Sequence, residues 1–334
     1  MTLLPWLQPT FDGLQRAWEA DRLPQGLLIH DAPGAGGRHL ARGIAQLVLC
    51  TGPRPACGEC SACRRVAKSE HPDLFFIGPS EDSKLGLILV DQIRELSEQL
   101  SLTSYEGRGS VAVLSPADAM NHQAANALLK TLEEPRRDAY LVLHTAHPSR
   151  LPATVLSRCQ KLAVRPPDRQ TALAWLQAQR QSADWPAALD VLGTAPLDAA
   201  AADPARLREL RDETWGALRD AGAGRLDVVR TADQWARQEP QLRLGCIENC
   251  LTRQILADSG AVAQSAEMGA GTHLSAPVLD INIAAAFTLL DSVRETRQQL
   301  TTALNKPLAL ERLLWRFHRS PGGREHGGTA TRQG

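Results

Sequence analysis

The sequence has no apolar run approaching the roughly 18 residues that a membrane-spanning helix needs. Its opening stretch, MTLLPWLQPTFDGLQ, has no basic region ahead of an apolar segment, so a secretory signal is not indicated. It also lacks an excess of either charge, since 37 Lys and Arg balance 37 Asp and Glu. This balance argues against a strongly basic nucleic-acid binder and leaves only local patches for any contact with DNA. We expect a cytoplasmic protein of two or three domains.

Four of the seven cysteines are crowded into one segment, at Cys50, Cys57, Cys60 and Cys63. In a reducing compartment such crowding suggests a metal site rather than disulfides. Four thiolates suit tetrahedral zinc, because two C-x2-C steps bring three sulfurs together and the longer gap returns the fourth. An iron–sulfur cluster fits less well, since the common ferredoxin run has its fourth cysteine after the third. Four reduced surface thiols remain the other alternative. With every position filled by protein, a zinc ion here would be structural.

Residues 128–159, LLKTLEEPRRDAYLVLHTAHPSRLPATVLSRC, predict a helix, a buried strand and then a short segment that ends on an arginine. Apolar residues recur at i, i+3, i+4 and i+7, as on one face of an amphipathic helix: Ala125, Leu128, Leu129 and Leu132. Pro135 ends that helix because proline lacks the amide hydrogen. The apolar run 140–143 is typical of a strand covered on both faces of a parallel sheet. Arg158 follows, where a guanidinium is well set to meet a phosphate.

LLKTLEEP, followed some twenty residues later by SRC, resembles the clamp-loader branch of the AAA+ ATPases. The resemblance runs from Pro5 to about Arg316. It implies an α/β AAA+ core, with a parallel sheet flanked by helices and a zinc-binding insertion, then a small helical lid domain and an all-α C-terminal collar domain. It also implies zinc at the four cysteines and an arginine finger at Arg158, reaching in trans to a neighbouring subunit's γ-phosphate. Spacing alone supports a second role for Arg158 equally well, that of a surface arginine that caps a helix or pairs with Glu133 or Glu134.

The composition changes after residue 164, where Arg165-Pro166-Pro167-Asp168 reads as a linker. We therefore expect a degenerate AAA+ core at 1–165 with its zinc module at 50–63, a lid at 166–208 and a collar at 209–334. The tail from about residue 319 lacks a hydrophobic face and is expected to be disordered. Within the core, apolar runs predict further strands at 26–30, 71–77 (after a turn), 86–90 and 111–114.

Residues 31–38, DAPGAGGR, have the framework of a P-loop without its chemistry. A working loop reads GxxxxGK[ST], with a lysine on the phosphates and a hydroxyl on magnesium. Here Asp31 replaces the first glycine and would repel a phosphate. Gly37 stands at the lysine position. Arg38 stands at the hydroxyl position, one place out of register to replace the lysine, and cannot ligate magnesium.

A second motif is also incomplete. The strand predicted at 111–114 should end in the acidic pair of a Walker B motif, but Ser115 and Pro116 follow it, and Asp118 comes too late. Thr145 stands where the family has its polar sensor 1 residue. The two losses predict no ATP hydrolysis at this chain's own site, and the resemblance implies the same, since the clamp-loader family includes a non-hydrolysing subunit.

With the two incomplete motifs, the resemblance implies a non-hydrolysing subunit of a DNA polymerase III clamp loader, which helps load the sliding clamp on primer–template DNA and donates Arg158 to a neighbouring ATPase. The resemblance implies partners: ATPase motor subunits, a clamp-opening subunit and, through the complex, the sliding clamp and DNA. The expected cofactor is structural zinc, with no ATP at its own site. The alternatives are an active ATP-hydrolysing motor paralogue, which shares the cysteines and SRC, and an unrelated zinc-ribbon nucleic-acid binder.

Overall fold

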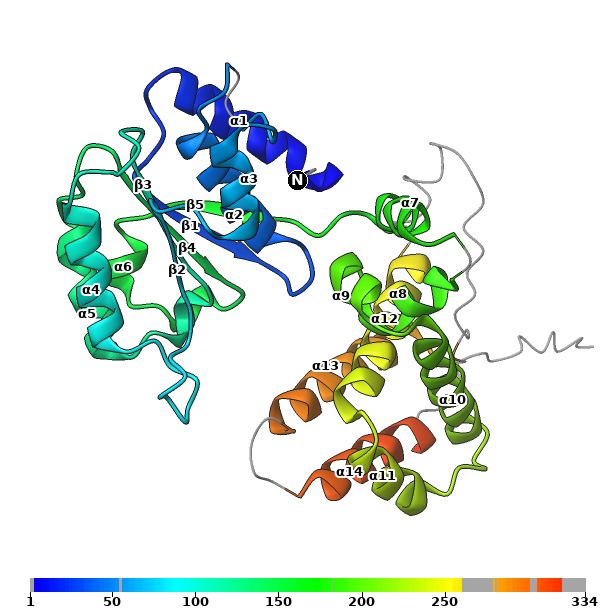
Figure 1. Cartoon of the computed structure of the whole chain (residues 1–334). Helices are drawn as coiled ribbons and strands as arrows, with labels where there is room; N and C mark the ends of the chain where they lie inside the picture. The colour runs from blue at the N-terminus through cyan, green and yellow to red at the C-terminus, as the bar shows by residue number, and fades with distance from the viewer. Residues whose placement is uncertain are drawn as a thin grey trace, which may run out of the picture. The chain divides into compact units, whose positions relative to one another are not determined.

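The computed structural model describes residues 3–53, 56–181, 183–259, 279, 281–300 and 305–319. The chain divides into two compact units, Met1–Trp175 and Leu176–Gly334 (Figure 1). In the described ranges, no helix is long and apolar enough to cross a membrane. The predicted disorder beyond residue 319 lies outside the described residues.

A five-stranded parallel sheet forms the centre of the first unit, in the order β2-β3-β4-β1-β5. Its strands are β1 (Gly26–Asp31), β2 (Leu74–Ile77), β3 (Ser110–Leu114), β4 (Ala139–Thr145) and β5 (Gln160–Val164). The central strands β3 and β4 are buried over nearly their whole length, as their continuous apolar runs predict. Because all pairings are parallel, the carboxyl ends of β1, β3 and β4 meet at one edge of the sheet.

Helices cover both faces of this sheet (Figure 1). One face carries α1 (Gln8–Glu19), α2 (Gly37–Leu49) and α3 (Ser61–Lys68), and the other carries α4 (Val90–Ser101), α5 (His122–Glu133) and α6 (Ala153–Leu156). Alternate strand residues such as Ala112, Leu114 and Leu141 pack against α4, α5 and α6 in one hydrophobic cluster. Each buried leucine there contributes about 1.5–3 kcal/mol. Three short 3-10 helices complete the unit: η1 (Pro5–Leu7), η2 (Ala117–Ala119) and η3 (Pro148–Arg150).

The run at 86–90 is not the strand that its apolar residues suggest. Ile88 forms an isolated bridge with Met120, and α4 already begins at Val90. The Leu89 N–H donates to the Gln92 side chain 2.9 Å away, so the chain turns into a helix before a second ladder bond can form.

Helix α7 (Arg169–Gln179) follows the linker and runs across the boundary between the two units. Asp168 caps it by accepting a hydrogen bond from the Thr171 N–H at 2.9 Å. The hydrogen bonds from the Thr171 hydroxyl and N–H lower the pKa of the Asp168 carboxyl.

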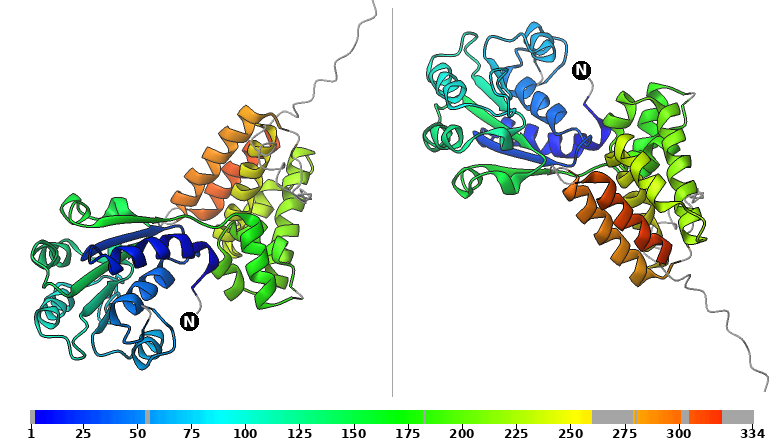
Figure 2. Two further views of the ribbon diagram at one scale, coloured as in Figure 1. Left: turned by 90° about the horizontal axis from the view of Figure 1, so that it is seen from above. Right: turned by 90° about the horizontal axis from the view of Figure 1, so that it is seen from below.

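The described part of the second unit is all helical. After α7 it contains α8 (Trp185–Leu192), α9 (Pro196–Ala201), α10 (Pro204–Gly222), α11 (Val228–Arg237), α12 (Pro240–Asp258), α13 (Ile283–Gln299) and α14 (Lys306–Arg319). Helices α13 and α14 lie side by side in both views of Figure 2. Helix α10 runs through residues 208 and 209, and the division of the chain at 165/166 and 208/209 stays a prediction.

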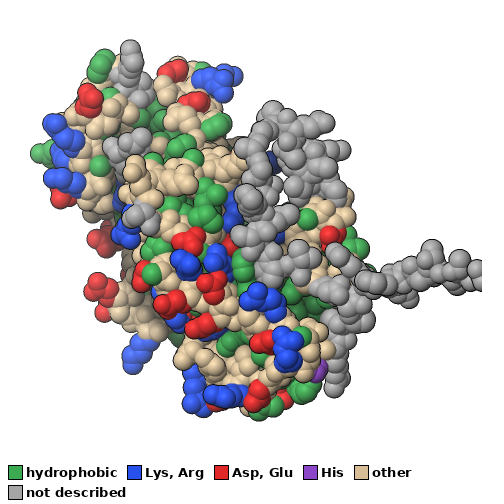
Figure 3. Space-filling model, turned by 90° about the vertical axis from the view of Figure 1, so that its right-hand side faces the viewer, with side chains coloured by type: hydrophobic (Ala, Val, Ile, Leu, Met, Phe, Trp, Pro, Cys, Tyr) green, Lys and Arg blue, Asp and Glu red, His purple; other side chains and the backbone are tan. Residues whose placement is uncertain are grey.

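Charges inside the second unit are paired. Asp190 is fully buried between Arg253, at 2.8 Å, and Arg211, at 3.5 Å. Arg243 is also fully buried, and it donates to Glu213 at 2.6 Å. On the face shown in Figure 3, acidic and basic side chains are interspersed. Pairing of this kind removes the large cost of an isolated buried charge.

Gly109 provides a test of the fold. Its φ is +124°, and an added Cβ would lie 2.5 Å from the main-chain oxygen of Asp138. We expect Gly109→Ala to lower the free energy of unfolding by about 1–3 kcal/mol in urea titrations. The control is Gly107→Ala, because Gly107 also has a positive φ, +72°, but faces open space. Equal losses in the two variants would contradict the close approach of the backbone at Gly109.

Candidate functional site

The incomplete P-loop lies at the carboxyl edge of the sheet, where three strands end together. Strand β1 ends at Asp31, and the glycine-rich turn leads into α2 at Gly37. Strand β3 ends one residue before Ser115, and β4 ends at Thr145. The sheet therefore assembles the positions that would surround a nucleotide in an active relative of this fold.

An internal carboxylate fills the phosphate position of the turn. The Gly37 N–H donates to Asp31 Oδ2 at 2.6 Å, and His144 Nε2 donates to Asp31 Oδ1 at 2.8 Å. Both side chains are largely buried, at 6% exposed for Asp31 and 12% for His144. In a working P-loop such main-chain N–H groups hold phosphate oxygens. Here the N–H at the start of α2 holds an anion that belongs to the chain itself.

The neighbouring polar groups are also engaged within the chain. The Nδ1 atom of His144 forms a hydrogen bond with the Ser115 hydroxyl, 2.8 Å away. The Thr145 hydroxyl donates to Asp118, and it accepts from the His147 N–H at 2.9 Å. Sequence reasoning named Asp31, Ser115, Asp118 and Thr145 but missed His144, which lies 113 residues from Asp31. No local signal in the strand marks that histidine.

Gly37 leaves room for this arrangement. A Cβ at this position would lie 2.7 Å from Asp31 Oδ2 and 2.7 Å from His144 Nε2. No side chain, and in particular no P-loop lysine, fits there while Asp31 and His144 remain bonded. The absence of a lysine at position 37 and the contact between Asp31 and His144 are therefore linked, because a side chain at this position would displace both residues.

The four cysteines predicted to bind metal converge at the end of α2. Cys50 follows α2, Cys57 lies in a turn, Cys60 caps α3 and Cys63 lies in its first turn. Their sulfurs all lie within 4.8 Å of one another, with Cys50–Cys57 at 3.6 Å, Cys50–Cys60 at 3.9 Å and Cys57–Cys63 at 4.0 Å. Tetrahedral Zn²⁺ with bonds of about 2.3 Å places its sulfurs about 3.8 Å apart. The four side chains thus fit a closed zinc site.

The main chain around the cluster favours thiolates, which are the form that binds zinc. Sulfurs accept from N–H groups at three points: Gly52 to Cys50 at 3.4 Å, Cys60 to Cys57 at 3.4 Å and Cys63 to Cys60 at 3.3 Å. The N–H groups of Cys60 and Glu59 lower the pKa of the Cys57 thiol. The other three cysteines lie outside the cluster, and burial raises the pKa of Cys159 to about 11.

Arg158 lies between α6 and β5 with a third of its side chain exposed. Its NH1 donates to the Thr154 carbonyl at 2.8 Å, and its NH2 pairs with Glu133, at the end of α5. Pairing with Glu133 or Glu134 is the surface role that the sequence offers as the alternative to an arginine finger, and the structure contains the contact with Glu133. An exposed ion pair contributes at most about 1 kcal/mol, so Arg158 can exchange Glu133 for a stronger anion.

The chain is similar in sequence to one protein family and to several of its named members. A family model described as "DNA polymerase III, delta subunit" matches residues 7–168. Proteins named DNA polymerase III subunit delta' are similar to the chain: that of Pseudomonas aeruginosa is 37% identical over 70% of this chain and 71% of its own. That of Yersinia pestis is 30% identical over 78% of each. That of Escherichia coli is 36% identical over 54% of each, so this match spans about half the relative's length.

The cysteine cluster predicts zinc content. Purified wild-type chain should carry about one zinc ion, and Cys57→Ser should lose it and unfold at a lower temperature, because three ligands no longer close the site. Elemental analysis and thermal melting measure both effects. Cys159→Ala removes a cysteine outside the cluster and should keep the zinc. Retention of full zinc content by Cys57→Ser would rule out these four ligands.

The crowding at Gly37 predicts an energetic coupling. Gly37→Ala should lower the free energy of unfolding by about 1–3 kcal/mol, because the methyl group displaces Asp31 and His144. In a chain already carrying Asp31→Ala and His144→Ala, the same substitution should cost clearly less. Urea titrations of all four combinations give the coupling directly. Additive effects, within about 0.5 kcal/mol, would show that Gly37 does not make room for this pair.

Proposed function

Because this chain belongs to the family of the DNA polymerase III delta' subunits, we propose that it is a clamp-loader subunit that does not hydrolyse ATP. In this role it helps load the sliding clamp on primer–template DNA. Its partners are ATPase motor subunits and a clamp-opening subunit, and it meets the clamp and the DNA through the complex. It works in the cytoplasm as a structural and activating member of the assembly.

The filled phosphate loop is the observation that carries the non-hydrolysing role. The loop N–H that would bind a phosphate already binds Asp31, and this carboxylate would repel the triphosphate. No lysine follows the loop, and Ser115 and Pro116 stand where carboxylates would hold magnesium and activate water. These features disfavour the motor paralogue, which would need the lysine and both carboxylates.

Arg158 is the group that this subunit would contribute to catalysis. A guanidinium offers a planar fork of donors and keeps its charge at every physiological pH. When a neighbouring subunit presents a bound triphosphate, Arg158 leaves Glu133 and pairs with the γ-phosphate. The weak surface pair then orients the side chain near the interface without holding it there.

Zinc would have a structural part in this function. The four sulfurs leave no open coordination position for a substrate or water, so the ion would not act as a catalyst. It would fix α3 against the end of α2 and so set the shape of this side of the core.

ATPase measurements on a reconstituted clamp loader test the finger. With Arg158→Ala, hydrolysis at the one site that Arg158 serves should fall on the order of 10³-fold while the complex still assembles. Arg158→Lys should recover little, because lysine lacks the planar fork. The control is Arg94→Ala, which removes a surface arginine, 67% exposed, that pairs with Asp91 on its own helix.

Two outcomes contradict the proposal. Hydrolysis by the isolated chain would show that the filled loop is catalytically competent. An unchanged rate from an assembled Arg158→Ala complex would leave Arg158 as a local partner of Glu133 and nothing more.

A further inference from the structure

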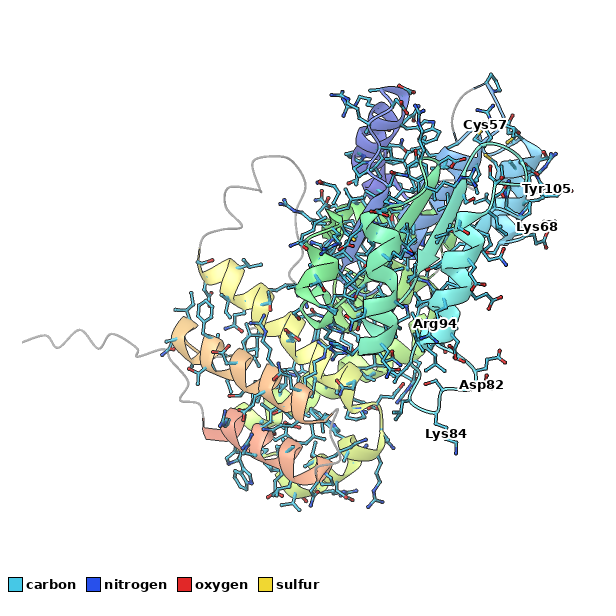
Figure 4. All side chains as sticks on the ribbon, turned by 90° about the vertical axis from the view of Figure 1, so that its left-hand side faces the viewer. Cys57, Lys68, Asp82, Lys84, Arg94 and Tyr105 are labelled. Atoms are coloured by element: carbon cyan, nitrogen blue, oxygen red, sulfur yellow. The ribbon has the colours of Figure 1, made fainter. Side chains whose placement is uncertain are left out.

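A surface on the zinc side of the first unit carries exposed aromatic and basic side chains that the clamp-loader role does not use. Tyr105 is 83% exposed and Phe76 39% exposed. We call this the aromatic–basic surface, and it consists of Arg42, Arg64, Lys68, Phe76, Tyr105 and Arg108. In Figure 4, Tyr105 and Lys68 lie together at one tip of the unit, and Lys84 lies at its other end.

The backbone that carries Tyr105 is fixed. The buried carboxylate of Asp73 accepts from the Tyr105 N–H at 2.6 Å and from the Glu106 N–H at 3.0 Å. The Ser104 hydroxyl accepts from the Gly109 N–H at 3.3 Å. A large aromatic ring is thus held out in solvent on a loop that is tied down at both ends. Binding to such a ring costs little loss of backbone entropy.

The cations beside Tyr105 are available to a phosphate. Arg65 pairs with Glu106 and so offsets the acidic residue next to the tyrosine, and the buried His71 ring also contacts Glu106. Arg64 and Lys68 are four residues apart on one exposed side of α3. Among the described side chains, no carboxylate forms an ion pair with either of them or with Arg108, and the nearby Glu59 and Glu70 flank α3 at its two ends.

Two contacts of Arg42 join Phe76 to the same surface. Arg42 donates to the Ser69 hydroxyl, directly after α3, at 3.3 Å. The same guanidinium lies over the Phe76 ring, 5.6 Å from its centre. Helix α3 therefore connects the Tyr105 loop, through Arg65 and Glu106, with the Phe76 ring on the edge strand β2.

We infer that the aromatic–basic surface binds single-stranded nucleic acid. Alternating rings and cations fit a chain of bases and phosphates, since any unpaired base can stack on an exposed ring while the cations neutralise the backbone. In a duplex the bases are stacked inside the helix, so only its phosphates could contact this surface, through the cations, and the aromatic rings would have no partner. A protein partner would need a larger continuous apolar centre than two separated rings provide. The choice of DNA rests on the proposed function, but binding can be measured without a clamp loader.

Fluorescence anisotropy of the full-length chain with a labelled oligo-dT about 15 nucleotides long tests this inference. Tyr105→Ala should weaken binding about tenfold, and Tyr105→Phe should stay within about twofold, because stacking needs the ring and not the hydroxyl. Lys68→Ala together with Arg108→Ala should reduce the salt dependence, log Kd against log[salt], by about 0.7 per cation lost.

The matched control is Lys84→Ala, which removes one exposed lysine from the far end of the same unit. It should bind oligo-dT like the wild type. The inference fails if the wild type does not bind, if Tyr105→Ala binds as well as Tyr105→Phe, or if duplex DNA or polyglutamate binds as tightly as oligo-dT. None of these outcomes touches the ATPase test of Arg158, so the two proposals can fail separately.

Discussion

A buried carboxylate held between a main-chain N–H and a histidine ring is the interaction on which the carboxyl edge of the sheet depends. Asp31 ends β1, Gly37 begins α2 and His144 lies near the end of β4, so one side chain joins three elements. The amino end of a helix carries unsatisfied N–H groups and a partial positive charge. In a nucleotide-binding fold the phosphate satisfies them. In this chain the Asp31 carboxylate accepts a hydrogen bond from the Gly37 N–H at the start of α2.

In the proposed function, this constraint separates two roles that an active ATPase combines in one subunit. The chain's own nucleotide position is committed to internal hydrogen bonds, whereas Arg158 is held only by an exposed glutamate and a carbonyl. A buried, multiply bonded group is costly to release, and a surface ion pair is not. The core is thus fixed where a nucleotide would bind and adaptable where a neighbour would meet it.

The sequence predicted those parts of the fold that depend on local pattern. Apolar runs located the central strands, the spacing of Leu128 and Leu132 located α5, and C-x2-C steps located residues that do converge. It could not predict His144, because its role depends on Asp31, which is distant along the chain. It also misread residues 86–90, where the Leu89 N–H donates to the Gln92 side chain and the chain turns into α4 instead of continuing as a strand. The sequence also left the pairing of Arg158 with Glu133 as one of two alternatives. The two residues belong to different elements, and the local sequence of neither element shows that they lie close together.

The strand order has a consequence for synthesis of the protein on the ribosome. Strand β1 is an inner strand of the sheet, yet both of its neighbours, β4 and β5, come late in the chain. Gly26 pairs with Leu141 and Leu27 with Gln160. At translation rates of about 5–20 residues per second, the apolar residues of β1 wait on the order of ten seconds for a partner. The cysteine segment closes a much shorter loop and can form in that interval. The sheet can be complete only after β5, an edge strand and the last strand of the chain, has been made.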